Sequence, residues 1–289
     1  MHRTGNRWIQ LLRADRPAGI YLLLLPILWA LYASPHPAPT PYLLLIFVMG
    51  AVVTRSGGCI VNDLLDRRFD RAVERTRHRP LADGRIRPRQ ALLLLAGLAG
   101  LGLILLLQLS PTSIMIGVLA VPLIGLYPLA KRWLPIPQSW LAIVFNLGAL
   151  MAGVEMDGRI TPLTWGLYTA AIFWTLAYDS IYACCDQADD QRLGLHSAPL
   201  LLGRHLKTFL YGCYGLMAAM WVLGWAARAG EASDWGVMVA GLLPIWWLGW
   251  MLRRLDLHNP AACLRHFSRQ HPLAGGAMLL AILLENLIR

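Results

Sequence analysis

Apolar runs of membrane-spanning length recur along this chain almost from end to end, with short polar segments between them. One helix needs about 20 mainly apolar residues to cross a bilayer. No polar or low-complexity linker interrupts the pattern, so we expect a single all-α, polytopic transmembrane domain over residues 1–289. The nine predicted membrane helices cover residues 17–33, 42–61, 91–109, 112–130, 137–154, 161–183, 206–227, 235–252 and 271–288.

Composition agrees with this interpretation and narrows the possible partners. The chain is 57% hydrophobic and only 15% charged, whereas soluble domains carry roughly 25% charged residues. The net charge of +10 could suggest a nucleic-acid partner. The basic residues, however, lie in the segments between apolar runs, where membrane topology explains them. We therefore expect membrane lipid, and no nucleic acid, around this protein.

The same basic residues predict the orientation. Alternate segments between the predicted helices hold 22 Lys and Arg residues on one side of the membrane and three on the other, with Arg55 inside a helix. Because Lys and Arg accumulate in cytoplasmic loops, the N-terminus should be cytoplasmic and the C-terminus outside. This places the polar segments after the second and sixth predicted helices in the cytoplasm, as would be expected for a bacterial inner-membrane protein.

Those two polar segments hold seven of the 16 acidic residues, in residues 63–70 and 179–190. Asn62, Asp66 and Asp70 are four residues apart, a spacing that keeps side chains on one helix face. Asp179, Asp186 and Asp190 stand at offsets 0, 7 and 11, which also form one helical stripe, with Tyr182 beside it at offset 3. Like charges in a stripe repel one another unless a cation lies between them.

The chemistry of these stripes indicates Mg²⁺ and a phosphorylated substrate. Oxygen-only ligands favour Mg²⁺ over softer metals. Mg²⁺ usually binds through a few carboxylates together with substrate phosphate. Two acidic helix ends that faced each other would hold metal around a diphosphate. The segment 62–90 supplies arginines for the phosphate oxygens, although topology and anionic lipid also account for basic residues there; these arginines are Arg67, Arg68, Arg71, Arg75, Arg77 and Arg79.

Arg55 lies seven residues before Asn62, on the same helical stripe and deeper in the membrane. A lone cation at such a depth costs at least about 2.5 kcal/mol unless it is paired or faces a cavity. Its partner is either an anionic group of a substrate, such as a carboxylate, or an internal carboxylate or helix carbonyl. Arg13, at the start of the first predicted helix, is a weaker candidate for the same role.

Two motifs carry a resemblance to a known family. The first signature of the UbiA superfamily of intramembrane prenyltransferases resembles the run Asn62-Asp63-x-x-Asp66-Arg67-x-Phe69-Asp70, with Val73-x-Arg75-Thr76-x-x-Arg79-Pro80-Leu81-x-x-Gly84. The second signature is similar to Tyr178-Asp179-x-x-Tyr182-Ala183-x-x-Asp186-x-x-Asp189-Asp190. Further local features resemble the branch that prenylates 4-hydroxybenzoate in ubiquinone synthesis; they are Arg13-x-Asp15-Arg16-Pro17-x-Gly19, Arg55-x-x-Gly58-Cys59, Tyr127-Pro128-x-x-Lys131-Arg132 and Pro137-Gln138.

The resemblance implies a bundle of nine helices with a central cavity open to lipid and a polar cap facing the cytoplasm. It implies Mg²⁺ as cofactor, and polyprenyl diphosphate and 4-hydroxybenzoate as substrates. Metal contacts are expected from Asn62, Asp66, Asp70, Asp186 and Asp190. Catalytic roles are expected from Asp66, Asp179, Asp190 and Arg55, with Arg55 on the benzoate carboxylate. Substrate contacts are further expected from Arg13, Asp63, Arg67, Arg75, Arg79, Lys131, Arg132, Tyr178, Tyr182 and His196.

One position departs from the family, and two other functions remain open. The family often has Gly-x-Lys-Ser after the second motif, where this chain has Gly194-Leu195-His196-Ser197. A histidine is not reliably charged near neutral pH. A sister enzyme with another acceptor, such as homogentisate, a dihydroxynaphthoate, haem or a chlorophyllide, would use the same metal site. An anion transporter would instead place charges near the bilayer midplane. The sequence predicts no particular oligomeric state.

Overall fold

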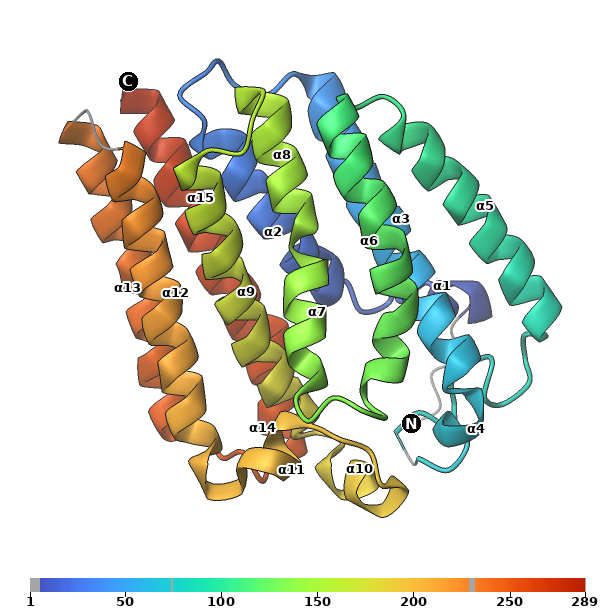
Figure 1. Ribbon diagram of the computed structural model, residues 1–289. Coiled ribbons are helices and arrows are strands. Elements are labelled where there is room, and N and C mark those ends of the chain that lie inside the picture. The colour runs from blue at the N-terminus through green and yellow to red at the C-terminus, as the bar shows by residue number, and fades with distance from the viewer. Residues whose placement is uncertain (1–5, 74, 229–231, 289) are drawn as a thin grey trace.

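The computed structural model describes residues 6–73, 75–228 and 232–288, and throughout these ranges the regular structure is helical, with no β-strand. The predicted all-α class is therefore confirmed. Arg3 and Arg289, which entered the charge count, lie outside the described residues. The helices pack side by side as a bundle, with short helices gathered at one end (Figure 1). The helices that run along the bundle are α2 (Ala18–Ala33), α3 (Pro41–Leu65), α5 (Pro88–Leu106), α6 (Pro111–Ala130), α7 (Pro137–Phe145), α8 (Leu147–Asp157), α9 (Pro162–Ala183), α12 (Leu206–Arg228), α13 (Ala232–Arg254) and α15 (His271–Ile288).

Each predicted membrane range coincides with one of these helices or, for 137–154, with the pair α7 and α8 that meets at Asn146. Within the described residues, six helical stretches are long and apolar enough to cross a membrane. The six stretches are Pro41–Leu65, Pro88–Leu106, Pro111–Ala130, Pro137–Asp157, Ala198–Arg228 and Asp234–Arg254. They show a multi-pass membrane protein, whereas the count of nine crossings stays a prediction. The short elements are α1 (Arg7–Leu11), α4 (Arg67–Asp70), α10 (Gln187–Leu193), α11 (Ala198–Leu202), η1 (Gly203–His205), α14 (Pro260–Arg265) and the π-helical turn η2 (His266–Gln270).

Several long helices begin at a proline that follows a hydroxyl residue. Thr40, Ser110 and Thr161 cap α3, α6 and α9, and each side-chain oxygen accepts a hydrogen bond from the backbone N–H three residues later. Proline fits the first helical position because its φ is already helical and no N–H is needed there. The cap satisfies one of the otherwise unpaired N–H groups.

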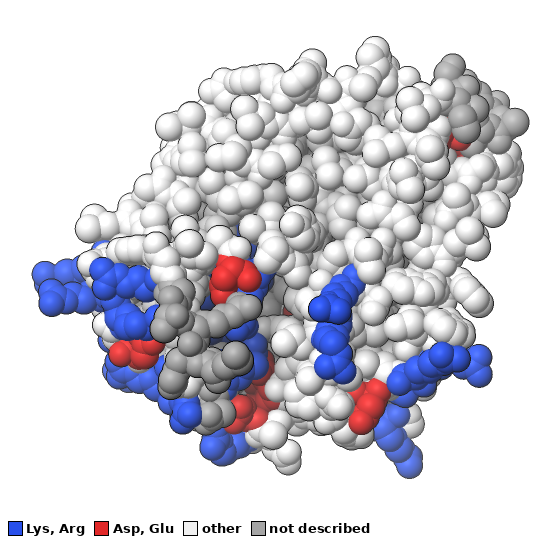
Figure 2. All heavy atoms as spheres, turned by 180° about the vertical axis from the view of Figure 1, so that it is seen from behind, with Lys and Arg blue, Asp and Glu red and all other residues white. Residues whose placement is uncertain are grey.

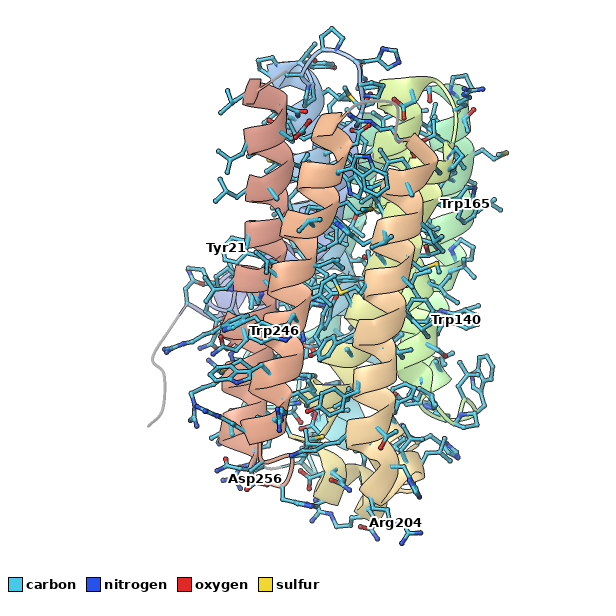
Figure 3. The ribbon with its side chains drawn as sticks, turned by 90° about the vertical axis from the view of Figure 1, so that its left-hand side faces the viewer. Tyr21, Trp140, Trp165, Arg204, Trp246 and Asp256 are labelled. Carbon is cyan, nitrogen blue, oxygen red and sulfur yellow. The ribbon has the colours of Figure 1, made fainter. Side chains whose placement is uncertain are left out.

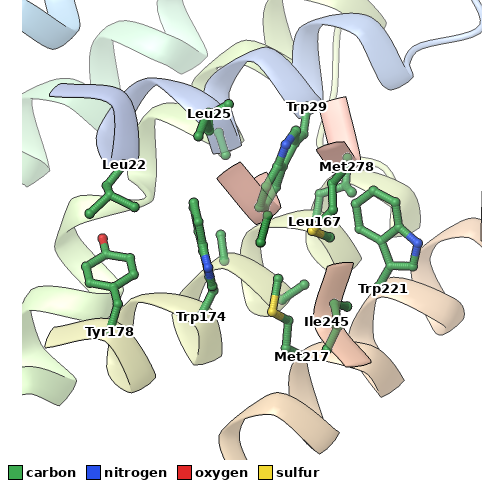
Figure 4. Close-up of a cluster of buried hydrophobic side chains, with 14 of the residues drawn as sticks. Leu22, Leu25, Trp29, Leu167, Trp174, Tyr178, Met217, Trp221, Ile245 and Met278 are labelled. Carbon is green, nitrogen blue, oxygen red and sulfur yellow. The ribbon is translucent and has the colours of Figure 1, made fainter. Parts of the chain in front are cut away.

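A tryptophan cluster ties the middle of the bundle together (Figure 4). The ring of Trp29 on α2 lies 5.1 Å from that of Trp174 on α9 and 6.0 Å from that of Trp221 on α12. Its indole N–H donates to the carbonyl of Gly275 on α15, at 2.9 Å. All three tryptophans are fully buried. Because buried tryptophans contribute a large apolar area, this cluster holds four helices around one centre.

Helices α9 and α12 cross closely at Gly166 and Gly224. A Cβ placed on Gly166 would lie 2.4 Å from the Cα of Gly224. This is a backbone atom, so the clash cannot be relieved by turning a side chain. Overpacking of this kind typically costs about 1–3 kcal/mol. Gly166→Ala is therefore expected to lower the melting temperature of the purified protein. Gly276→Ala on α15 is the control, because a Cβ there meets nothing within 4 Å. Equal melting temperatures for the two variants would contradict the crossing.

The surface divides into an apolar wall and one charged end. Trp165 and Trp246 project outward from the bundle (Figure 3), with 49% and 68% of their surfaces exposed. Lys, Arg, Asp and Glu gather at the end that holds the short helices (Figure 2). Exposed apolar side chains on this scale suit contact with lipid tails. We call this end of the bundle, formed by α4, α10, α11 and α14, the charged end.

Candidate active site

The two acidic segments share one backbone form. In the first, α3 ends at Leu65 and α4 begins at Arg67, with Asp66 between them at φ −92° and ψ 6°. In the second, α9 ends at Ala183, and Asp186 caps α10 at φ −115° and ψ 4°. Both aspartates thus occupy the sparsely populated bridge region of backbone space. Each stripe, expected from the sequence to follow one continuous helix, instead bends at an aspartate.

Arg75 joins the two acidic segments. Its Nε donates to Oδ1 of Asp186 at 2.6 Å, and its Nη2 also contacts the same carboxylate. Its Nη1 donates to the hydroxyl of Tyr182 at 2.7 Å. On the outer side, Arg192 of α10 donates to the carbonyl of Ala72 at 2.8 Å. The predicted facing of the two motifs is therefore present, and a guanidinium fork links them.

We call the two acidic segments the first wall (residues 62–70) and the second wall (residues 179–190). Lys131, in the turn after α6, lies between these two walls. It interacts electrostatically with Asp66 of the first segment and with Asp179 and Asp190 of the second. His196 holds this turn, since its backbone N–H donates to the carbonyl of Lys131 at 2.9 Å. The predicted substrate contact His196 thus lies against the lysine turn, with its ring Nδ1 3.3 Å from the same carbonyl oxygen.

Burial perturbs the carboxylates on both walls. It raises the pKa of Asp66 above its ordinary value, against the opposing effect of Lys131. It raises the pKa of Asp190 to about 6, again against Lys131. Burial raises a carboxylate pKa because the charged form loses solvation. Asp66 is half-buried and Asp190 is buried, so the charged form of each carboxylate is poorly solvated. A bound cation would compensate for this lost solvation.

A second ionic network lies behind the first wall. Asp63 is buried and accepts from Nη2 of Arg13 at 2.6 Å and from Nη1 of Arg79 at 3.1 Å. The same nitrogen of Arg79 donates to Asp70 at 2.9 Å. Arg13 reaches this position with φ +56°, a left-handed conformation that is strained for arginine. In this state Asp63 and Asp70 are paired with arginine, so their predicted contacts with substrate and metal stay predictions.

Two further arginines that the sequence predicted as substrate contacts, Arg67 and Arg132, have different surroundings. Nε of Arg67 donates to the carbonyl of Leu81 at 2.9 Å, which pins residues 67–82 against one another. Arg132 stands 3.9 Å from Oδ1 of Asp66 and 5.3 Å from the ring centre of Phe69. Arg132 therefore lies beside the first wall, whereas Arg67 stabilises the segment that forms this wall.

Arg55 lies deeper, against α2 and an aromatic wall. A Cβ on Gly19 would stand 2.5 Å from its Nε, so the guanidinium packs directly on the α2 backbone. Its Cζ lies 5.9 Å from the ring centre of Phe145. Its other electrostatic neighbours include the phenol groups of Tyr127 and Tyr178. Arg55 also interacts electrostatically with Asp179, so its predicted partner, either a substrate anion or an internal carboxylate, stays a prediction.

Sequence reasoning missed the residues that hold the two tyrosines. The ring of Phe267, on η2, lies 4.7 Å from that of Tyr182 and 5.7 Å from that of Tyr178. His271 stands 5.6 Å from the Tyr178 ring. The extra residue of a π-turn often marks a functional site. Nothing in the polar segment 253–270 signalled such a turn, because its apolar residues have no helical period and no acidic motif accompanies them.

The residues suit a magnesium ion that is completed by water and substrate. Within the described ranges, no three Asp, Glu, His or Cys side chains form a closed cage. Asn62, Asp66, Asp186 and Asp190 nevertheless offer only oxygen donors, on two walls. Mg²⁺ retains several waters and often takes only one or two carboxylates together with phosphate oxygens. The donor set therefore fits an ion that arrives with a phosphorylated substrate.

Comparison with known proteins gives three findings. The model of the UbiA prenyltransferase family matches residues 23–281. A 4-hydroxybenzoate octaprenyltransferase of Thiobacillus denitrificans is 38% identical over 283 residues, covering 97% of this chain and 94% of the relative. One of Azotobacter vinelandii is 37% identical over 286 residues, covering 99% and 95%.

Solved structures show a common fold. A UbiA homologue of Archaeoglobus fulgidus bound to GPP and Mg²⁺ superposes with a TM-score of 0.76 at 18% identity, covering 96% of this chain and 99% of that one. The apo UbiA homologue of Aeropyrum pernix gives 0.72 at 22% identity, covering 94% and 98%.

Proposed function

The chain belongs to the UbiA prenyltransferase family, and we propose that it transfers a polyprenyl group from polyprenyl diphosphate to 4-hydroxybenzoate in ubiquinone biosynthesis. The group attaches to the ring carbon beside the hydroxyl, and diphosphate is released. The observation that carries the proposal is the paired acidic walls, bridged by Arg75 with Lys131 between them, together with a half-buried Arg55 on α3. Relatives over nearly the whole chain carry the name 4-hydroxybenzoate octaprenyltransferase, which supports the acceptor.

The walls provide the diphosphate site. Arg75 and Arg132 donate to phosphate oxygens through their guanidinium forks, and Lys131 donates as a single ammonium group. Mg²⁺ held by Asn62, Asp66, Asp186 and Asp190 neutralises charge on the leaving diphosphate. Asp70 supports this set as a second-tier ligand or water holder.

The chain's own residues account for the acceptor half of the reaction. The bond between the prenyl carbon and the diphosphate oxygen breaks, and an allylic cation forms. The rings of Tyr178 and Tyr182 stabilise it through their π-faces. Arg55 holds the carboxylate of the acceptor, so that the carbon beside its hydroxyl faces the cation. Asp179 orients the phenol and receives the ring proton that is lost when the new carbon–carbon bond has formed.

We place the charged end in the cytoplasm and the protein in a bacterial inner membrane. The split of 22 to 3 basic residues supports this orientation, and both relatives named above are bacterial. We further propose a central cavity between the helices, open to lipid, for the polyprenyl tail. The exposed apolar walls of the bundle support entry from the bilayer.

The test is a membrane assay with 4-hydroxybenzoate, a polyprenyl diphosphate and Mg²⁺. Transfer to the acceptor should depend on all three and stop when EDTA is added. Homogentisate and 1,4-dihydroxy-2-naphthoate, supplied in parallel, distinguish a sister activity. Undiminished transfer after chelation would overturn the metal site, and transfer only to another acceptor would overturn the substrate assignment.

The magnesium requirement should depend on pH. Because burial raises the pKa of Asp190 to about 6, protons compete with Mg²⁺ for this carboxylate below that pH and hardly compete above pH 7. The Mg²⁺ concentration for half-maximal activity should therefore rise about tenfold per pH unit below 6 for each competing proton. Excess Mg²⁺ should restore activity at pH 5.5. A requirement that stays constant between pH 5 and 8 would contradict the assignment of Asp190.

A further inference from the structure

Two buried aspartates and two half-buried arginines form an ionic chain that leads from the N-terminal segment into the first wall. Its order is Arg13, Asp63, Arg79 and Asp70. Nη2 of Arg13 donates to both oxygens of Asp63, at 2.6 and 2.9 Å. Nη1 of Arg79 donates to Oδ1 of Asp63 at 3.1 Å and to Oδ2 of Asp70 at 2.9 Å. Two cations thus balance two carboxylates, and both carboxylates share Arg79.

The N-terminal segment holds Arg13 beside Asp63. Leu11 of α1 is fully buried and belongs to the same apolar cluster as Ile60 of α3. Nη1 of Arg13 donates to the carbonyl of Gln10 at 2.7 Å, across the turn in which Arg13 has its φ of +56°. A residue other than glycine keeps such a conformation only where its surroundings hold it. The turn therefore serves to aim this guanidinium at Asp63.

Burial makes the balance of charges in this chain important. The side chain of Asp63 is 1% exposed and that of Asp70 is 9% exposed. Removing one partner of a buried ion pair leaves an uncompensated charge. Of the two arginines that donate to Asp63, the loss of Arg13 would leave Arg79. This arginine would then move toward Asp63 and away from Asp70.

We propose that Arg13 and Asp63 are positioning residues of the first wall. Arg13 compensates the charge of Asp63, which leaves Arg79 to hold Asp70. Asp70 is the last residue of α4, and this helix begins directly after Asp66, so the pair with Arg79 holds the metal-facing end of the wall in place. The inference rests on the proposed site for magnesium and diphosphate. It assigns Arg13 to that site and not to the carboxylate of the acceptor.

The experiment measures metal binding directly. Full-length protein in detergent, with inorganic diphosphate, is titrated with Mn²⁺, which takes the same oxygen ligands as Mg²⁺, and free Mn²⁺ is read by electron paramagnetic resonance. Arg13→Gln should weaken Mn²⁺ binding about tenfold, because partners that orient metal ligands commonly contribute 10- to 100-fold to affinity. Arg13→Lys, which keeps a cation beside Asp63, should lose less. Arg7→Gln is the control, since Arg7 is an exposed arginine of the same segment and should leave binding unchanged.

A double variant separates positioning from a substrate contact. Asp63→Asn in the Arg13→Gln background removes the unpaired carboxylate, so Arg79 can hold Asp70 again. Mn²⁺ affinity should return to within about twofold of wild type, the range in which independent changes add. In the transfer assay, the KM for 4-hydroxybenzoate should stay at the wild-type value in the single and the double variant. Melting temperatures in the same detergent show which variants are folded; if Arg13→Gln is not, Arg13→Lys and the charge-balanced double variant decide.

The possible failures are distinguishable. Equal Mn²⁺ affinity in wild type and Arg13→Gln, or a double variant no better than Arg13→Gln, would overturn the positioning role and leave the proposed reaction intact. A KM for 4-hydroxybenzoate that rises in both variants would assign Arg13 to the acceptor instead. Missing transfer to 4-hydroxybenzoate together with the expected Mn²⁺ pattern would overturn the proposed acceptor and retain this inference. Wild type that binds no Mn²⁺ would overturn both.

Discussion

Replacing Asp190 by asparagine is expected to lower kcat at least about a hundredfold, because a metal-bound phosphate site provides several kcal/mol of charge stabilisation. Asparagine keeps the shape and loses the charge that would hold Mg²⁺. The protein should fold normally, since burial already disfavours the charged form of Asp190 and raises its pKa to about 6. The measurement is steady-state prenyl transfer at saturating Mg²⁺, together with the melting temperature.

The neighbouring Asp189 provides the matched control. It belongs to the same acidic pair but forms an ion pair with Arg192 at 2.9 Å, with 27% of its side chain exposed. Surface pairs of this kind contribute about 0–1 kcal/mol to stability, so Asp189→Asn should retain most of the activity. Equal losses in the two variants would mean that total acidity, and not the wall position of Asp190, supports the reaction.

Asp189 and Asp190 show how much of the candidate site could be predicted from the sequence. The offsets along the second segment selected Asp190 and Asp186 over Asp189, and the structure buries Asp190 while it leaves Asp189 at the surface. The all-α class followed from the apolar runs alone.

Features that depend on tertiary packing could not be predicted in this way. The breaks at Asp66 and Asp186 replace one helical stripe by two short faces, and helical spacing contains no sign of them. The fork of Arg75 onto Asp186 joins residues 111 positions apart. Phe267 reaches Tyr182 from a polar segment without a motif. Each of these contacts depends on which helices become neighbours, and that information is distributed over the whole core.

The second large effect is expected at Arg55. Arg55→Ala should raise the KM for 4-hydroxybenzoate about a hundredfold, because truncating one partner of a buried charge pair costs about 2–5 kcal/mol. The KM for the polyprenyl diphosphate should change little. The neutral analogue 4-hydroxybenzamide sharpens the test: wild type should strongly prefer the acid to the amide, and Arg55→Ala should lose this preference. An equal rise in both KM values would contradict a role on the carboxylate.

Gly19→Ala tests the same contact without removing the charge. A Cβ at position 19 would stand 2.5 Å from Nε of Arg55, and the flexible guanidinium can move away from it. The fold should therefore tolerate the change, while the displaced cation meets the acceptor less well and raises the KM for the acid by a smaller factor. Gly50→Ala on α3, where a Cβ meets nothing within 4 Å, should leave both KM values unchanged. If Gly19→Ala instead altered the two KM values equally, the guanidinium would be a structural contact of α2 and not the partner of the aromatic carboxylate.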